Sequence, residues 1–185
     1  LKGKKHLQQV VLLQLIAQLN NEFYLGDRRV PKILLVDEAW EAFEDPMVAK
    51  FLEGAFRRMR KAAAAPVVVT QSLRDLYNSA SGEAIANNAA NVIVLRQNGE
   101  AIEALKESGR FNIGDYGYEM LKALHTEPGQ YSEVLFRSGT AWGVGRFVVD
   151  RFSQLLYSTM ASEVAALRAL RDSGMTGAEA IKHFI

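Results

Sequence analysis

The hydrophobic and polar positions along the chain switch between helical and strand-like patterns. Residues 7–19 carry apolar side chains at helical spacing over a wide face, which predicts a mostly buried helix. Residues 33–36 form a short apolar run, as expected of a parallel strand that is covered on both faces. An amphipathic stripe follows over residues 47–59, and Pro46 suits the first position of that helix. A second apolar strand is predicted at residues 67–70.

Alternating strands and helices continue until about residue 123, and the pattern then changes. We predict a third apolar strand at 92–95 and helices at 73–77, 82–90, 99–107 and 114–123. After Pro128-Gly129, we predict a β-hairpin whose strands are residues 131–137 and 140–149, with its turn at Ser138-Gly139. Three helices at 151–157, 162–172 and 177–184 are predicted to close the chain. The alternation over residues 30–96 indicates an α/β parallel sheet, to which the hairpin and the last helices are an appendix.

Two adjacent acids, Asp37 and Glu38, follow the first apolar strand directly. Ligands bind at the carboxyl ends of parallel strands, and adjacent acids there are costly unless a cation or a water network uses them. P-loop enzymes place an Asp at this position to hold Mg²⁺ and a following Glu to activate water. Gln71 ends the next strand and offers both donors and an acceptor for a polar sensor. The alternatives are an ordinary strand that ends in acids and a plain loop amide.

A basic cluster, Arg57, Arg58, Arg60 and Lys61, ends the helix between these two strands. Its cations lie off the buried stripe, so they are either a solvated face that favours the helix C-terminus or the source of an arginine finger for a neighbouring subunit. Arg74 and Arg96 are weaker candidates of the same kind.

The amino-acid composition of the chain excludes few classes of protein. The chain has 185 residues, is 49% hydrophobic and 23% charged, and carries a formal net charge of +1, so charge gives no argument for nucleic acid. It contains no cysteine, which excludes disulfides and thiolate metal sites. Its three histidines show no metal-ligand spacing, and Trp40 and Trp142 are expected as core or interface aromatics. Because the first residue is Leu1 and not Met, we expect the chain to begin inside a longer protein.

Seven stretches carry a resemblance to a known family: KILLVDEAWEAF at 32–43, FRRMRK at 56–61, PVVVTQSLRDL at 66–76, NNAANVIVLRQ at 87–97, GQYSEVLF at 129–136, VDRFSQLLYST at 149–159 and SGMTGAEAI at 173–181. Together they resemble the TraC-like ATPases of conjugative type IV secretion systems over nearly the whole chain. The first three are generic to the HerA/FtsK-like P-loop motors, and the last three point to this family.

The resemblance implies a hexameric, Mg-dependent ATPase at the cytoplasmic face of the bacterial inner membrane. It would energise pilus assembly and substrate transfer, with sister subunits, the secretion channel and inner-membrane proteins as partners. By position, Asp37 would hold Mg²⁺ through water, Glu38 would be the catalytic base and Gln71 the sensor. The cluster at 57–61 covers the family's basic motif, which includes the finger.

One feature of the family is missing from the sequence. No G-x-x-x-x-G-K-[ST] motif occurs, so we expect the phosphate loop and its lysine to lie upstream of Leu1. The expected fold is therefore a RecA-like P-loop parallel sheet at 1–127 that lacks its P-loop strand, with the hairpin and helical appendix at 128–185. The gap would lie between the sensor strand and the strand at 92–95, about 4.8 Å from each. The chain alone is expected not to hydrolyse ATP.

Two other functions remain open at this stage. A HerA/FtsK-like DNA translocase would share Asp37, Glu38 and Gln71, and would bind DNA in a salt-sensitive way; the near-neutral charge argues against it. A non-catalytic docking or oligomerisation module would use the apolar stripe of Val164, Leu167 and Leu170, although intramolecular packing is the favoured explanation of that stripe.

Overall fold

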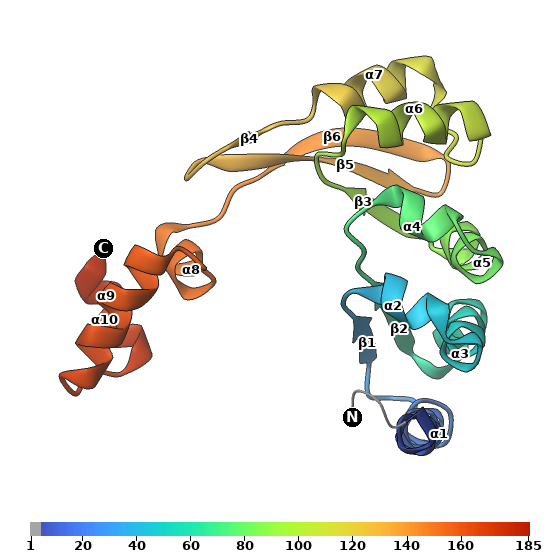
Figure 1. Ribbon diagram of the computed structural model, residues 1–185, viewed down its shortest axis with the longest axis horizontal. Helices are drawn as coiled ribbons and strands as arrows, with labels where there is room; N and C mark the ends of the chain where they lie inside the picture. Colours follow the sequence, from blue (N-terminus) through green and yellow to red (C-terminus); the bar gives the residue numbers. More distant parts are fainter. Residues whose placement is uncertain (1–4) are drawn as a thin grey trace.

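The computed structural model describes residues 5–185 and contains two separate β-sheets and a C-terminal group of helices (Figure 1). The N-terminal part runs through α1 (Lys5–Asn20), a π-helical turn η1 (Asn21–Leu25), β1 (Lys32–Val36), α2 (Ala39–Glu44), α3 (Pro46–Arg58), a 3-10 turn η2 (Met59–Ala62) and β2 (Ala64–Val68). The middle part contains α4 (Leu73–Tyr77), α5 (Ala80–Asn88), β3 (Asn91–Val94), α6 (Gly99–Ser108), α7 (Gly114–Ala123), β4 (Thr126–Glu127), β5 (Tyr131–Ser138) and β6 (Ala141–Phe147). The chain ends in α8 (Arg151–Leu156), α9 (Ala161–Asp172) and α10 (Gly177–Phe184).

The first sheet consists of β1 and β2, which pair in parallel from Lys32 opposite Ala64 to Val36 opposite Val68. The helix α3 packs against β2, and a small core forms there from Phe23, Ala55, Met59 and Ala64. Parallel strands need a crossover, and α3 supplies it. The predicted parallel pair with an intervening helix is therefore confirmed.

The second sheet is antiparallel and has the order β3–β5–β4, with β6 paired to β5. The predicted hairpin is present, with its turn at Gly139 in the left-handed region (φ 59°). The strand β3 pairs antiparallel with β5, from Asn91 opposite Ser138, and does not pair with β2, so the parallel sheet of the described residues consists of β1 and β2. That a strand absent from the chain joins β2 to β3 stays a prediction. The sheet thus joins residues on both sides of the expected boundary at 127/128, and that boundary stays a prediction.

Helices α6 and α7 contribute the largest core of the described residues, together with α4, α5 and the inner face of the second sheet. Its fully buried members include Phe111, Ile102, Leu121 and Leu135. Apolar residues at helical spacing on α6 and α7 face the alternating residues of β3 and β5, which is the usual packing of helices on an antiparallel sheet.

Two expectations about burial are wrong for the described residues. Strand β1 is covered on one face only, since Ile33 and Leu35 are 72% and 63% exposed. The helix α1 was expected to be mostly buried, but its own apolar side chains point to all sides of the helix, and Leu13 is 54% exposed. The apolar side chains of these segments are suited to burial on every side. The described residues cover them on one side only.

The start of α3 shows how sequence fixes an element locally. Pro46 occupies its first turn, where a missing N–H costs nothing, and the side chain of Asp45 accepts hydrogen bonds from the backbone N–H of Met47 and Val48 at 2.9 and 3.2 Å.

Replacing that cap tests this local account. We expect Asp45→Ala to lower the free energy of unfolding by about 1 kcal/mol, because two helix N–H groups lose their acceptor. Urea denaturation followed by circular dichroism measures the change. Asp45→Asn, which keeps a capping oxygen, should lose much less, and equal losses in both variants would contradict the capping role.

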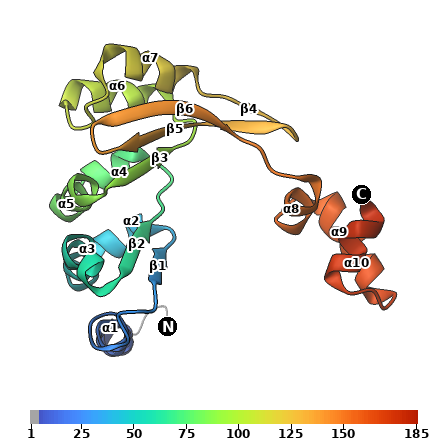
Figure 2. The same ribbon diagram turned by 180° about the vertical axis from the view of Figure 1, so that it is seen from behind.

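The helices α8, α9 and α10 pack with one another and lie apart from both sheets (Figure 2). A short segment, residues 148–150, joins them to β6, and Gln154 Nε2 donates to Gly129 O at 3.2 Å. Val164, Leu167 and Leu170 are half-buried on α9, which packs against α10. Among the described residues, no helix has the length and apolar character needed to cross a bilayer.

Candidate active site

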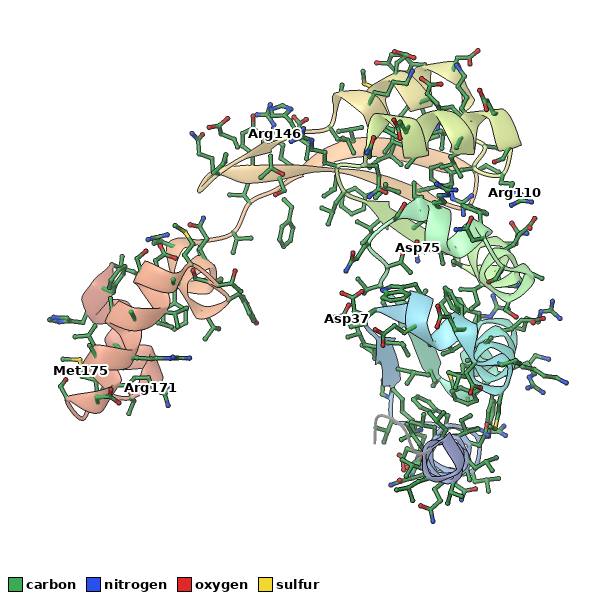
Figure 3. All side chains as sticks on the ribbon, viewed as in Figure 1. Asp37, Asp75, Arg110, Arg146, Arg171 and Met175 are labelled. Carbon is green, nitrogen blue, oxygen red and sulfur yellow. The ribbon has the colours of Figure 1, made fainter. Side chains whose placement is uncertain are left out.

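The carboxyl end of β1 carries the two predicted acids. Asp37 follows the strand directly (Figure 3), and Glu38 adopts a left-handed backbone (φ 51°, ψ 44°) that turns the chain into α2. A left-handed conformation is unfavourable for a residue with a side chain and persists where the surroundings impose it. Here the N–H of Ala39 donates to the carbonyl of Val69 at 3.0 Å, and Ala39 is fully buried. The turn therefore fixes Glu38 between the ends of β1 and β2.

Gln71 lies just beyond β2, in the loop that leads into α4. Ser72 caps that helix in a reciprocal capping box with Asp75, and Thr70 Oγ1 donates to Ser72 O at 3.1 Å. The backbone N–H of Leu73 donates to Gln97 Oε1 at 3.2 Å, which links this loop to the residues after β3. These bonds hold the loop in one shape and leave the Gln71 side chain exposed at the strand ends.

Gln71 and Glu38 meet although they are 33 residues apart in sequence. The Gln71 Nε2 atom lies 3.0 Å from Glu38 Oε1 and 3.1 Å from Glu38 Oε2. An ionised carboxylate only accepts hydrogen bonds, so the amide nitrogen, and not the amide oxygen, faces Glu38. The two residues that were chosen from separate strand ends therefore form one constellation.

Trp40 is the residue that the sequence reasoning missed. It was expected as a core or interface aromatic, but it is 38% exposed and its indole N–H donates to Glu38 Oε2 at 2.7 Å. The signal that was available is its position, two residues after the second acid and at the start of α2. Trp142 contacts Tyr116 at 6.0 Å between ring centroids and packs against the large core, so the expectation of a core aromatic is confirmed for it.

The hydrogen bond from Gln71, and then that from Trp40, hold the pKa of the Glu38 carboxyl below its ordinary value. A lowered pKa means that Glu38 is ionised at neutral pH, which is the form that accepts a proton from water. Because the pKa of Glu38 is lower in the folded state, these two bonds stabilise the fold at pH values above the ordinary pKa of a glutamate. Their contribution to the free energy of unfolding is lost as the pH falls through the lowered pKa. Since the site is exposed, solvent screens this contribution strongly.

Asp37 is exposed, and its Oδ1 accepts from the backbone N–H of Glu38 at 2.9 Å. In the part of the chain that the structure describes, no three acidic or histidine side chains gather as a metal cage. This donor set suits Mg²⁺ rather than zinc, because Mg²⁺ keeps several waters and needs only one or two carboxylates beside substrate phosphates. A Mg²⁺ ion here would take Asp37 directly or through water, and its remaining ligands from solvent and phosphate.

The basic cluster lies at the other end of the strands. Arg57 and Arg58 end α3, Arg60 and Lys61 lie in η2, and β2 starts only after them. Five strand residues separate the two ends by about 16 Å. Arg57 pairs with Glu53 at 2.8 Å, and Arg58 Nε donates to Gly54 O at 3.4 Å. Within one chain, the cluster and the carboxylate pair are therefore not brought together.

The other candidates are also placed. Arg74 is exposed on α4, and Arg96 is exposed after β3. His125 lies directly before β4, and its Nδ1 is 2.8 Å from Glu133 and its Nε2 is 3.2 Å from the Tyr131 hydroxyl. His183 is exposed on α10, and the side chain of His6 lies outside the described residues.

Comparison with known proteins identifies relatives of this chain. The family model described as "TraG P-loop domain" matches residues 1–185. Protein TraC of Escherichia coli (strain K12) is 22% identical over 187 residues, which covers 98% of this chain and 21% of that protein. The structure of VirB4 of Thermoanaerobacter pseudethanolicus matches with a TM-score of 0.58 at 23% identity, over 76% of this chain and 38% of that one. The chain thus spans about a fifth of the curated relative and about two fifths of the solved structure.

Proposed function

Because this chain belongs to the TraG P-loop domain family, we propose that it is the C-terminal part of an ATP-hydrolysing motor that serves a conjugative type IV secretion system. The observation that supports the proposal is the contact of Gln71 with Glu38 at the ends of two parallel strands. A carboxylate and an amide held together at that edge fit the water-activating and sensing groups of a P-loop ATPase.

Each residue of the constellation has a proposed role that its chemistry supports. Asp37 would hold Mg²⁺, directly or through water, and solvent and the phosphate oxygens of bound ATP would supply its other ligands. Glu38 accepts the proton of the attacking water, and Gln71 presents its amide to that water and to the γ-phosphate. These roles concern positioning and charge stabilisation, on which phosphoryl transfer chiefly depends.

The phosphate loop is proposed to lie in an upstream segment, because the sequence contains no G-x-x-x-x-G-K-[ST] motif. Strands β2 and β3 are not paired with each other, and they belong to different sheets. An added strand between them would give both an additional neighbour and would place the phosphate loop beside Asp37. Below, "the intact ATPase" means the protein in which this upstream segment is joined to the chain.

The basic cluster is proposed to act on a neighbouring subunit. The cluster of Arg57, Arg58, Arg60 and Lys61 precedes β2, whose five residues span about 16 Å to the end where the carboxylate pair lies. A finger from this cluster therefore serves a site in the next subunit, as in a hexameric ring. We further propose that the ring lies at the cytoplasmic face of the inner membrane, contacts the secretion channel and inner-membrane proteins, and energises pilus assembly.

The proposal is tested first by the isolated chain. We expect no Mg²⁺-dependent ATP hydrolysis from residues 1–185, because the chain lacks a phosphate loop, and clear turnover from the intact ATPase. A coupled phosphate-release assay measures both. Steady, Mg²⁺-dependent turnover by the isolated chain that is lost in Asp37→Asn would contradict the division of the site between two segments. An intact ATPase without turnover would contradict the function itself.

A further inference from the structure

The Glu38 carboxylate accepts hydrogen bonds unequally at its two oxygens. Oε2 accepts from the Trp40 indole at 2.7 Å and lies 3.1 Å from the Gln71 amide. Within the described part of the chain, Oε1 has the Gln71 contact alone, at 3.0 Å. Each carboxylate oxygen has about two lone-pair sites, so the two donors occupy those of Oε2 and leave one of Oε1.

The bond from Trp40 is the shortest of the three contacts and comes from a side chain with little freedom. Trp40 has only two rotatable side-chain bonds, and its backbone lies in the first turn of α2. That turn is anchored by the buried Ala39, whose N–H donates to Val69 O at 3.0 Å. A hydrogen bond to a carboxylate is stronger than one between neutral groups. The indole is thus a fixed point from which the carboxylate is oriented.

We propose that Trp40 is a positioning residue that orients the Glu38 carboxylate, so that Oε1 is the oxygen that receives the proton of the attacking water. The proposal rests on the proposed function, because it names the group that aims the proposed base. The proton moves from water to Oε1 while the water oxygen bonds to the γ-phosphorus and the bond to the leaving ADP oxygen breaks. Trp40 keeps its own proton throughout.

Gln71 does not make Trp40 redundant. Gln71 lies at the end of a different strand and contacts both oxygens. Its amide therefore restrains how far the Glu38 carboxylate lies from the end of β2 more than it restrains the rotation of the carboxylate about its own axis. The indole contacts one oxygen only, and this asymmetry fixes which oxygen is left for water. A base that turns away from the line of attack loses most of its effect, since catalysis depends on reacting groups held within a narrow geometry.

The hydrogen bond itself is tested in the isolated chain by the indole N–H signals of ¹⁵N-labelled protein. The chain has two tryptophans, so Trp142→Phe assigns the signals. We expect Glu38→Ala to shift the Trp40 indole proton upfield and to speed its exchange with water, and to leave Trp142 unchanged. A Trp40 signal that Glu38→Ala does not move would overturn the proposal.

The role is tested by steady-state ATP hydrolysis of the intact ATPase. Trp40→Phe keeps an aromatic ring and removes the N–H, and we expect it to lower kcat roughly ten-fold with KM for ATP little changed. Trp40→His, which restores a ring N–H, should recover part of kcat. Trp142→Phe is the matched control, because it removes an indole N–H outside the site, and it should leave kcat unchanged.

The outcomes separate this inference from the proposed function. Wild-type kcat in Trp40→Phe together with an inactive Glu38→Gln would overturn the positioning role and leave the proposed function intact. Wild-type kcat in both variants would overturn the proposed function. A loss in Trp40→Phe that Trp40→His does not recover at all would assign the effect to ring packing, and so would also overturn the positioning role.

Discussion

Glu38→Gln in the intact ATPase is expected to lower kcat by roughly 10²–10⁴-fold, the range that a general base contributes. The substitution keeps the length of the side chain and an oxygen that can accept from Trp40, but it removes the negative charge that takes a proton from water. Binding of Mg-ATP should persist, because Asp37 and the phosphate loop remain. Stopped-flow hydrolysis and equilibrium binding of a labelled nucleotide measure the two properties separately.

A neighbouring acid provides the matched control. Glu41 is exposed on α2, three residues after Glu38, and its N–H donates to the Glu38 carbonyl at 3.1 Å. Its side chain has no hydrogen bond or ion pair within the described part of the chain. Glu41→Gln removes the same charge from the same short helix, and we expect wild-type kcat. Equal losses in the two variants would show that the net charge of this edge, and not the base, sets the rate.

Phe111→Ala is expected to lower the free energy of unfolding of the second sheet by about 3–5 kcal/mol. Phe111 is completely buried in the core under α6 and α7, and the Arg137 guanidinium lies 5.0 Å from its ring centroid. Removing the ring leaves a cavity and takes away the cation–π contact. Urea denaturation followed by the fluorescence of Trp142, which packs against this core, measures the change.

Tyr116→Ala is the control for that experiment. Tyr116 is also aromatic, lies five residues away on α7 and is 69% exposed. Its removal should change the free energy of unfolding by less than about 1 kcal/mol, since the side chain is largely exposed and loses a 6.0 Å contact with Trp142. A Phe111→Ala loss no larger than the Tyr116→Ala loss would contradict the view that this cluster is the main core of the second sheet.

The sequence predicted most helices and strands because their patterns are local. The stripe of α3 with Pro46, and the Gly139 turn of the hairpin, carry their structure within a few residues. The pairing of β3 could not be predicted in this way. An apolar run such as Val92–Val94 fits a parallel or an antiparallel neighbour equally, and its partner β5 follows some 40 residues later.

The exposure of apolar side chains could not be predicted from local sequence patterns either. The run at Ile33–Val36 is apolar at every position, as in a strand covered on both sides, yet Ile33 and Leu35 are exposed. Residue type reports the environment that a side chain is suited to, and the described residues supply a covering layer on one side of β1 only. The same reasoning applies to the outer side of α1, where Leu13 is exposed.

The site was predicted from chemistry at strand ends, and its limits follow from the same source. Asp37, Glu38 and Gln71 were selected because parallel strands bring their carboxyl ends to one edge, and Gln71 does contact Glu38. Trp40 was missed because an aromatic after two acids suggests packing, and only the left-handed turn at Glu38 lets the indole reach that carboxylate. The whole basic cluster was predicted at the end of one helix, but only Arg57 and Arg58 lie on α3, and Arg60 and Lys61 lie in η2. Its separation from Asp37 could be seen only once the direction of β2 was known.

The distance of the bound metal–nucleotide from each tryptophan shows whether ATP and its metal bind at Asp37 and Glu38. The two tryptophans of the chain lie in different parts of the fold, Trp40 in α2 beside Glu38 and Trp142 on β6. In the intact ATPase labelled with 5-fluorotryptophan and loaded with a non-hydrolysable ATP analogue, Mn²⁺ replaces Mg²⁺ as a paramagnetic probe. We predict that Mn²⁺ broadens the fluorine signal of Trp40 and leaves that of Trp142 sharp. A sharp Trp40 signal with Mn-nucleotide bound would contradict the placement of the metal at Asp37 and Glu38.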